Sequence, residues 1–237
     1  MSTLKTTNIQ HASAASAAIV LASDGTATAS LSSLNGGPLS GARNVIINPN
    51  FDIWQRGTSF SNPSSNSYLA DRWMAQDVSS TGTISQQAFT AGQTAVPNNP
   101  LYFIRIAQTG AGIYRLCQRI EAQFNGALGG QTYTLSFWAK TPSSGAISSI
   151  YFSQDNFASG ARTDTQVASS TITLSSSWTK YTYTGTFPSI SGKTLQSSTY
   201  ASVEFYVSSG TQTVDIAQVQ LEAGSVATPF ERRSYGQ

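Results

Sequence analysis

The amino-acid sequence predicts an all-β protein, built as a sandwich or a barrel, on three observations. Only 10% of its 237 residues are charged, so the chain lacks the Lys, Glu and Arg that long solvent-facing helices need. Aromatic residues make up 11%, and serine and threonine together exceed one residue in four, which favours a pleated, half-buried surface. Short segments that alternate between apolar and polar residues are separated by turn signals rich in Gly, Pro, Asn and Ser.

The alternation is clearest in residues 133–140, 181–186 and 200–208, where every second residue is apolar or aromatic. A period of two is the signature of a strand with one buried face. Further strands are predicted at 44–48, 69–76, 83–90, 101–107, 147–153, 167–174 and 212–221. About ten short strands with regular turns indicate a sandwich or barrel.

Residues 113–121 are compatible with a helix or a strand. Ile113, Leu116, Cys117 and Ile120 fit a helical spacing, yet Arg115, Arg119 and Glu121 all share one parity. We favour a strand because the polar residues segregate cleanly to one side of a period-two pattern.

The composition changes near residue 43, which divides the chain into an N-terminal segment, 1–42, and a body, 43–237. About half of the first segment is Ala, Ser or Thr, and no aromatic residue precedes Phe51. One copy of such a segment has too little apolar area to offset its ordering entropy. The turn signal Asp24–Gly25 between 19–21 and 26–28 still indicates a hairpin. Two alternatives follow: a disordered tail, or short strands that find apolar partners in other copies of the chain.

The single histidine, His11, and the single cysteine, Cys117, restrict the chemistry. A Ser-His-Asp triad would require His11, and a structural zinc site would require more ligands than these two. The basic residues are too dispersed for a nucleic-acid surface, and no apolar run is long enough to span a bilayer. We therefore expect no enzyme, no cofactor, no nucleic-acid partner and no membrane insertion. The one remaining enzymatic route is a carboxylate pair of the glycosidase kind.

Asp215 is the most informative acidic residue, because its parity matches the apolar residues Ala217, Val219 and Leu221 of the same predicted strand. A buried carboxylate is unfavourable unless it is paired or coordinated. We expect an arginine, backbone amides or a calcium ion as its partner. At the chain's end, Glu231, Arg232 and Arg233 are expected to pin the terminus to the body through salt bridges.

Candidate binding residues are sought on the outward faces of the predicted strands. By parity, five side chains point away from the apolar side: Trp138, Tyr151, Tyr200, Glu204 and Tyr206. Flat aromatic rings can stack on sugar rings, and a carboxylate can accept hydrogen bonds from sugar hydroxyls. These residues are therefore the candidate carbohydrate-binding platform. Exposed aromatic residues equally mark protein interfaces, which is the competing interpretation.

Several segments, taken in their order, carry a resemblance to known proteins. They are NVIINPNFDIWQRG at 44–57, ADRW at 70–73, QRIE at 118–121, YTLSFWAK at 133–140, WTKY at 178–181, VDIAQVQLEAG at 214–224 and ATPFERR at 227–233. This series resembles phage tail-fibre and virion structural proteins of the marine and cyanobacterial phage type. It is also similar to the jelly-roll carbohydrate-binding modules of secreted glycosidases. The opening TLKTTNIQ at 3–10 is similar to the starts of marine phage fibre proteins.

The resemblance implies a two-sheet antiparallel jelly-roll head behind a short stalk or anchoring segment. It implies a location in the virion, a homotrimer, attachment to other virion proteins through residues 1–42, and contact of the head with host surface glycans. Jelly-roll modules often hold a structural calcium near their terminal strands, which makes Asp52 a second acid of interest. Two alternative functions stay open. The first is a purely structural decoration or adaptor protein that binds other virion proteins, and the second, which we favour less, is a glycan-degrading enzyme.

Overall fold

The computed structural model describes residues 8–9, 19–21, 23, 27–29, 43–76, 78–121 and 128–232. The chain divides into two compact units, Met1–Gly41 and Ala42–Gln237. The elements described in both units are β-strands, which confirms the predicted all-β class.

The described part of the first unit is a three-stranded antiparallel sheet. Its strands are β1 (Asn8–Ile9), β2 (Ile19–Leu21) and β3 (Ala27–Ala29), in the order β1-β2-β3. The pairing of β2 with β3 is the one that the hairpin signal predicts, although Asp24 and Gly25 themselves lie outside the described residues, as does His11. Val20 and Leu21 are 45% and 40% exposed, so β2 presents apolar surface to solvent.

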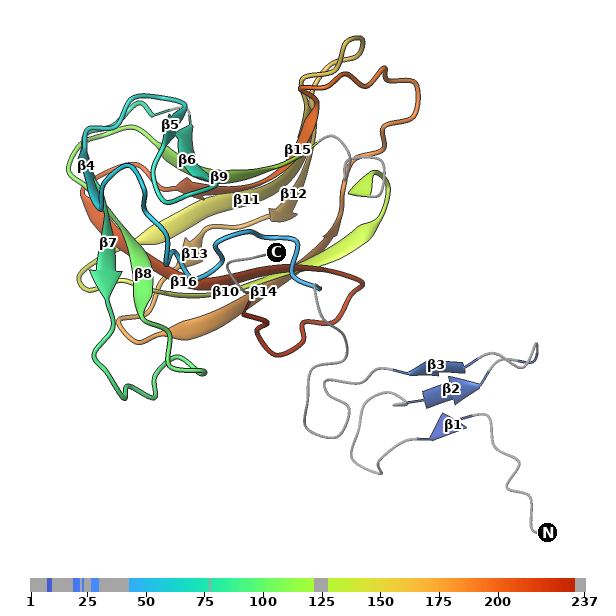
Figure 1. The fold of residues 1–237 in the computed structure, drawn as a ribbon, viewed down its shortest axis with the longest axis horizontal. Helices are drawn as coiled ribbons and strands as arrows, with labels where there is room; N and C mark the ends of the chain where they lie inside the picture. Colours follow the sequence, from blue (N-terminus) through green and yellow to red (C-terminus); the bar gives the residue numbers. More distant parts are fainter. Residues whose placement is uncertain are drawn as a thin grey trace. The chain divides into compact units, whose positions relative to one another are not determined.

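The second unit is a sandwich of two antiparallel sheets, seen as two layers in Figure 1. The six-stranded sheet contains, in spatial order, β14 (Thr179–Thr186), β10 (Thr132–Lys140), β16 (Gln212–Ala223), β8 (Tyr102–Gln108), β7 (Gly82–Ala88) and β4 (Ser59–Ser61). The seven-stranded sheet contains β12 (Thr163–Ala168), β11 (Ala146–Asp155), β15 (Tyr200–Val207), β9 (Tyr114–Glu121), β6 (Trp73–Gln76) and β5 (Ser67–Tyr68), and β13 (Ile172–Thr173) pairs with β11.

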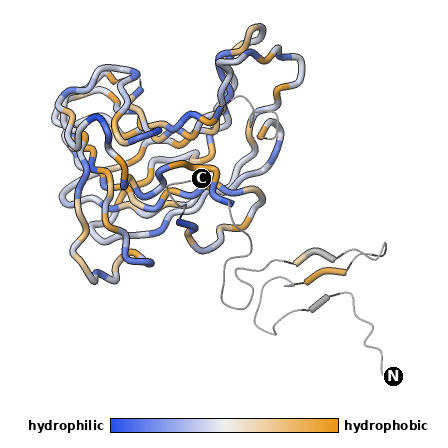
Figure 2. The backbone as a smooth tube through the Cα atoms, in the orientation of Figure 1, coloured by the Kyte–Doolittle hydropathy of each residue, from blue (hydrophilic) through white to orange (hydrophobic). Residues whose placement is uncertain are grey.

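The core lies between the two sheets and is built from the apolar half of each alternation. In β15, Ala201, Val203, Phe205 and Val207 are fully buried. The ring of Phe205 packs edge-on against that of Phe137 in β10 of the opposite sheet, with centroids 5.0 Å apart. Figure 2 shows the same pattern along the tube, where short apolar and polar stretches alternate. Burial of these side chains is the main favourable contribution to folding.

The ambiguous segment 113–121 forms strand β9, which confirms the interpretation based on parity. Segment 167–174 does not form one strand: it is divided between β12 and β13.

The prediction of a strand at 44–48 is wrong. Residues 43–46 belong to no strand, and a backbone hydrogen bond from Val45 N to the Leu221 carbonyl joins them to β16. The Asn44 carboxamide adds side-chain contacts: its oxygen accepts from the amides of Ile46 and Leu221, and its nitrogen donates to the Val219 carbonyl. Asn48 then adopts a positive φ of 52°, which ends any extended run.

The terminal segment after β16 is fixed to the body as expected. The carboxylate of Glu231 accepts hydrogen bonds from the amides of Arg43 and Asn44, at 2.7 and 2.9 Å. Arg232 forms an ion pair with Asp52 at 3.7 Å. These contacts bring the two ends of the body together, while Arg233 lies outside the described residues.

Candidate functional site

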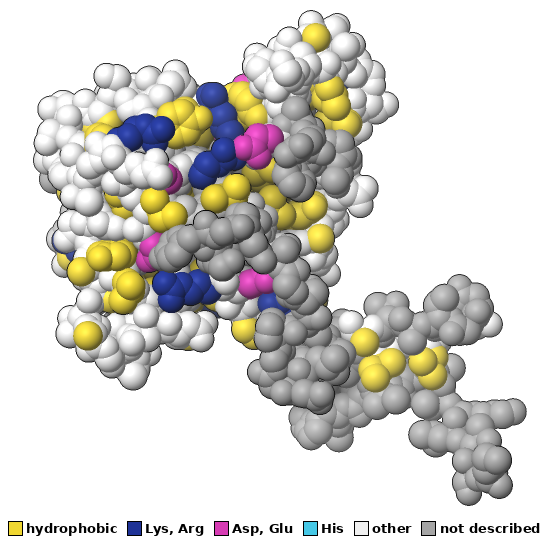
Figure 3. All heavy atoms as spheres, in the orientation of Figure 1, with side chains coloured by type: hydrophobic (Ala, Val, Ile, Leu, Met, Phe, Trp, Pro, Cys, Tyr) yellow, Lys and Arg dark blue, Asp and Glu magenta, His cyan; other side chains and the backbone are white. Residues whose placement is uncertain are grey.

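The candidate site is the outer face of the seven-stranded sheet, meaning the side chains of β9, β11 and β15 that point away from the core. The antiparallel register places Tyr200 opposite Glu121, Ser202 opposite Arg119 and Tyr206 opposite Arg115. Because side chains alternate across a strand, these pairs stand together on one surface. In the upper part of the sandwich unit, Figure 3 shows basic side chains lying beside acidic and hydrophobic ones.

Four of the five predicted residues come together on this outer face. Tyr151 lies opposite Glu204 in the register of β11 and β15, and its ring meets that of Tyr206 edge-on with centroids 5.1 Å apart. Tyr200 lies at the start of the same strand. All three tyrosines are half-buried.

Trp138 does not belong to this group, so the single platform expected from sequence is corrected. It lies on β10 of the six-stranded sheet, opposite Lys180 of β14 and Ala217 of β16. Parity correctly indicates that Trp138 points away from the core. It cannot indicate which of the two sheets a strand joins, and the outer faces of the two layers point in opposite directions.

Glu204 is not the exposed acceptor that the sequence suggests, because its side chain is 0% exposed. Its carboxylate accepts from Arg115 Nη1 at 3.0 Å and Arg162 Nη2 at 2.8 Å. The hydroxyl of Ser202 donates to it at 2.7 Å. Glu204 therefore orients the side chains around it and is not itself available to a ligand.

The ionisation of Glu204 follows from these contacts. Burial alone would raise the pKa of this carboxyl, but the hydrogen bond from Arg162, the charge of Arg115 and the hydroxyl of Ser202 together lower it below its ordinary value. Burial also lowers the pKa of Arg162, and its pairing with Glu204 outweighs that effect and raises it. Both groups are thus held as ions.

Arg162 extends this network towards the edge of the sheet. Its guanidinium also pairs with Asp164 at 2.9 Å and Asp155 at 3.6 Å. Asp155 in turn accepts from the hydroxyl of Tyr200 at 3.0 Å. The hydroxyl of Tyr200 is therefore linked to the ion-pair network around Arg162.

Cys117 lies under the same face and is inert as a nucleophile. Its thiol is fully buried and lies 3.1 Å from Gln76 Oε1, to which it donates. Burial first, and the nearby Glu204 second, raise the pKa of the thiol to about 12.

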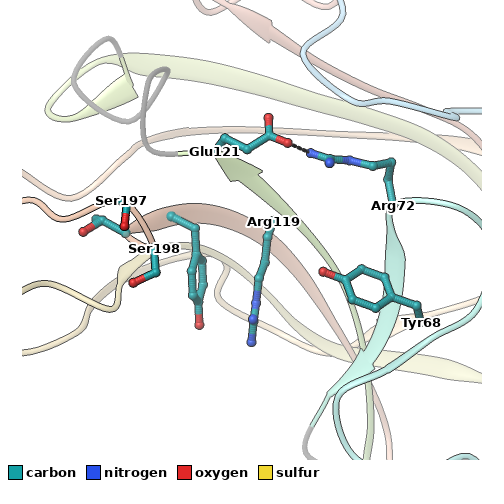
Figure 4. A pocket seen from close by; sticks show the side chains of 8 residues that line it. Tyr68, Arg72, Arg119, Glu121, Ser197 and Ser198 are labelled. Carbon is teal, nitrogen blue, oxygen red and sulfur yellow. Dashed lines mark hydrogen bonds and ion pairs between the residues drawn. The ribbon is translucent and has the colours of Figure 1, made fainter.

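A pocket of about 220 Å³ opens at one end of this face. Arg119 lies across it with its guanidinium 4.2 Å from the ring centroid of Tyr200. Arg72 and Glu121 form an ion pair beside it. The pocket is lined by Tyr68, Arg72, Arg119, Glu121, Ser197, Ser198, Thr199 and Tyr200. We name it the Arg119 pocket; Figure 4 shows Arg119 between Tyr68 and the Ser197–Ser198 segment.

Sequence reasoning did not single out Arg119 as a site residue. It gave Arg119 only as part of the polar parity of 113–121. The available signal was the alternation itself, which places Arg115, Arg119 and Glu121 on one face of β9. The partners that turn this face into a pocket come from β5 and from the loop before β15, and no sequence pattern connects those segments.

Asp215 has the arginine partner that was one of the three expected alternatives. Its fully buried carboxylate accepts from Arg105 Nε at 2.7 Å and Nη2 at 2.8 Å, in the bidentate geometry that suits a planar guanidinium. This hydrogen-bonded pairing, reinforced by charge attraction, raises the pKa of Arg105 although burial opposes it. Asp52, the second acid of interest, pairs with Arg232. Within the described residues, no group of three or more His, Cys, Asp or Glu side chains could hold a metal ion.

A second aromatic group lies on the outer side of the six-stranded sheet. The rings of Phe89, Phe103 and Trp178 have centroids 4.9 to 5.2 Å apart. Lys140 Nζ is 5.2 Å from the ring centroid of Trp178. Phe103 is only 6% exposed, whereas Phe89 and Trp178 are half-buried.

No helix in the described parts of the chain is long and apolar enough to cross a bilayer. No protein-family model matches the chain, and no curated protein is significantly similar to it in sequence.

Among solved structures, the chain is similar to the enzymatically active domain of tailspike protein 4 from bacteriophage CBA120. The identity is 16% and the TM-score 0.45, over 80% of this chain and 22% of that one. It is similar to the CBM22-1 xylan-binding domain from Paenibacillus barcinonensis, with 11% identity and a TM-score of 0.42 over 71% and 94% of the two chains. It is also similar to TmCBM61 in complex with β-1,4-galactotriose, with 11% identity and a TM-score of 0.38 over 77% and 100%. This chain spans about a fifth of the length of the tailspike structure.

Proposed function

We propose that this protein is a non-enzymatic glycan-binding component of a phage virion, a fibre or appendage whose head contacts host surface glycans. The observation that carries the proposal is the outer face of the seven-stranded sheet. There Tyr151, Tyr200 and Tyr206 are half-buried, and Tyr200 borders an open pocket. Because neighbouring residues already hold these half-buried rings, binding a ligand on their flat surfaces costs little side-chain conformational entropy.

The same face supports binding more than catalysis. Hydrolysis by a carboxylate pair needs one acid whose pKa is raised, so that it can donate a proton. Glu204 has its pKa lowered, and Asp155, Asp164 and Glu121 are each paired with an arginine. These acids serve to orient the arginines and tyrosines around them.

The first unit supplies the assembly part of the proposal. Residues 1–42 would attach the protein to other virion proteins and hold a homotrimer together, since Val20 and Leu21 of β2 expose apolar surface that copies of the chain could cover. Several heads on one particle would raise a weak affinity for each glycan through avidity. The competing function, a structural decoration or adaptor protein, would use the same apolar strand to bind another virion protein.

A glycan array tests the proposal, using the full chain, Tyr200→Ala and Trp138→Ala. Tyr200→Ala removes a ring from the candidate face, and Trp138→Ala removes one from the opposite sheet as a matched control. We expect wild type and Trp138→Ala to bind the same glycans and Tyr200→Ala to bind them at least tenfold more weakly. Binding that is lost in Trp138→Ala and kept in Tyr200→Ala would move the site to the other sheet. No binding by wild type would favour the structural alternative.

A further inference from the structure

The Arg119 pocket contains a guanidinium without a protein partner. Arg119 makes no hydrogen bond and no ion pair within the described part of the chain, and its Nε is buried without an acceptor. The neighbouring Arg72 is neutralised by Glu121. The lining of the pocket therefore has one positive charge in excess, and that charge belongs to Arg119.

The position of this guanidinium is set before any ligand arrives. Its plane lies over the ring of Tyr200, 4.2 Å from the centroid, which is a favourable cation–π distance. Tyr200 is itself held through its hydroxyl by Asp155. A stacked guanidinium keeps its N–H edges free, and those edges match the two oxygens of a carboxylate.

Hydroxyl groups surround the charge. Tyr68 is 43% exposed at one side of the pocket, and Ser197 and Ser198 are exposed at the other, as Figure 4 shows. The serine loop is anchored, because Asn156 Nδ2 donates to the Ser198 carbonyl at 2.9 Å and the Thr199 hydroxyl donates to the Asn156 carbonyl at 2.9 Å. A charged centre with hydroxyls and a tyrosine ring around it suits a sugar ring that carries an acidic group.

We propose that the Arg119 pocket binds the carboxylate of an acidic saccharide, such as a uronic or sialic acid residue. The guanidinium of Arg119 pairs with the carboxylate, and the ring of Tyr68 and the hydroxyls of Ser197 and Ser198 contact the rest of the sugar. This inference rests on the proposed glycan-binding function and adds the class of glycan. Neutral sugars would leave the Arg119 charge without its counter-ion.

The test is a calorimetric titration of the full chain with a panel of paired saccharides. The acidic probes are oligogalacturonate, oligomannuronate and sialyllactose; their neutral counterparts are the methyl esters of the first two, and lactose. Arg119→Gln removes the charge, Arg119→Lys keeps it without the planar fork, and Lys180→Ala removes an exposed charge from β14 of the other sheet. Thermal melting of each variant shows that it is folded.

We expect at least one acidic probe to bind tenfold or more tightly than its neutral counterpart, with an affinity that falls as salt is added. Arg119→Gln should reduce that preference to less than twofold, Arg119→Lys should keep part of it, and Lys180→Ala should keep all of it. If acidic and neutral members bind equally, or if the preference survives Arg119→Gln, the acidic-sugar inference is overturned while glycan binding stands. If no member binds, the acidic-sugar inference fails, and the glycan array then decides whether the glycan-binding proposal fails with it. If only a sulfated oligosaccharide binds through Arg119, the carboxylate assignment is wrong.

Discussion

At the scale of single residues, buried ion pairs hold the side chains of the outer face in their positions. A carboxylate loses its hydration when it is buried, and only several strong hydrogen bonds offset that loss. Glu204 has them, from Arg115, Arg162 and Ser202. The same contacts orient Tyr206, whose hydroxyl accepts from Arg115 at 2.7 Å. This buried network supports the exposed side chains of the face and fixes their orientation.

Replacing Glu204 by glutamine should therefore reduce stability in a pH-dependent way. The folded-state pKa of Glu204 lies below the value of 4.5 for a free glutamate, so its contribution is complete above that value and is lost as the pH falls through the folded pKa. At neutral pH we expect Glu204→Gln to cost about 3 kcal/mol, because Arg115 and Arg162 both lose the charged acceptor that Glu204 provides.

Urea denaturation of both proteins at a series of pH values measures this effect. Between about pH 5 and pH 3 the difference between wild type and Glu204→Gln should shrink. A difference that stays constant over this range would show that Glu204 is not ionised in the folded protein.

Asp215 offers a second test at the same scale, in the opposite sheet. Its carboxylate is fully buried, whereas the side chain of its partner Arg105 is 29% exposed and can be partly rehydrated. We expect Asp215→Ala to reduce the unfolding free energy by about 3 kcal/mol, at the lower end of the range for orphaned buried pairs. The double replacement Asp215→Leu with Arg105→Met should cost less than the sum of the single changes, as measured by the same denaturation. Additive costs would mean that the two side chains are not coupled.

At the scale of elements, parity predicts the strands whose two faces differ strongly. Residues 200–208 and 113–121 alternate between core and outer face, and both form strands, β15 and β9. Segment 44–48 resembles a strand in composition, but the Asn44 carboxamide and the positive φ of Asn48 replace a ladder there. The short strand β4 has too few residues to show any period. Local pattern thus identifies the long strands. It predicts a strand wrongly where side-chain hydrogen bonds replace the ladder, and it misses a strand that is too short to show a period.

The same limit applies to the site. Sequence parity placed Tyr151, Tyr200 and Tyr206 on outer faces, and all three lie on the outer face of the seven-stranded sheet. Tyr151 and Tyr206 are in contact, and Tyr200 lies at the other end of β15. It could not exclude Trp138, because strand order within the sheets is a property of long-range pairing. It also could not distinguish the buried Glu204 from an exposed one, since the arginines that pair with it come from two separate segments: Arg115 lies on β9 and Arg162 just before β12.

The closure of the sandwich between its two edge strands gives a prediction at this scale. Gly185 of β14 faces Val167 of β12, and a Cβ added at Gly185 would overlap Cγ1 of Val167. Gly185→Ala should therefore cost about 1–3 kcal/mol through overpacking. Val167→Ala in the same chain should restore most of that loss, because it removes the obstructing methyl group. If the second change gives no recovery in thermal melting, the two strands do not meet as described.

At the scale of the whole molecule, the two units should have separable roles. A chain shortened to residues 41–237 retains the complete core of the sandwich, so it should stay folded with a cooperative melting transition. We expect it to lose, in light scattering, the homotrimeric state that we propose for the full chain. A shortened chain that remains a trimer of unchanged stability would show that the first unit is not the trimerising element and would favour a role in docking onto another virion protein.

The location of a bound saccharide tests the central claim most directly, and a crystal structure of the full chain with a glycan identified on the array provides it. We predict that the sugar lies on the outer face of the seven-stranded sheet, within about 4 Å of the ring of Tyr200, with any acidic group paired to Arg119. A sugar bound instead on the outer face of the six-stranded sheet, beside Trp138 or Trp178, would contradict the account.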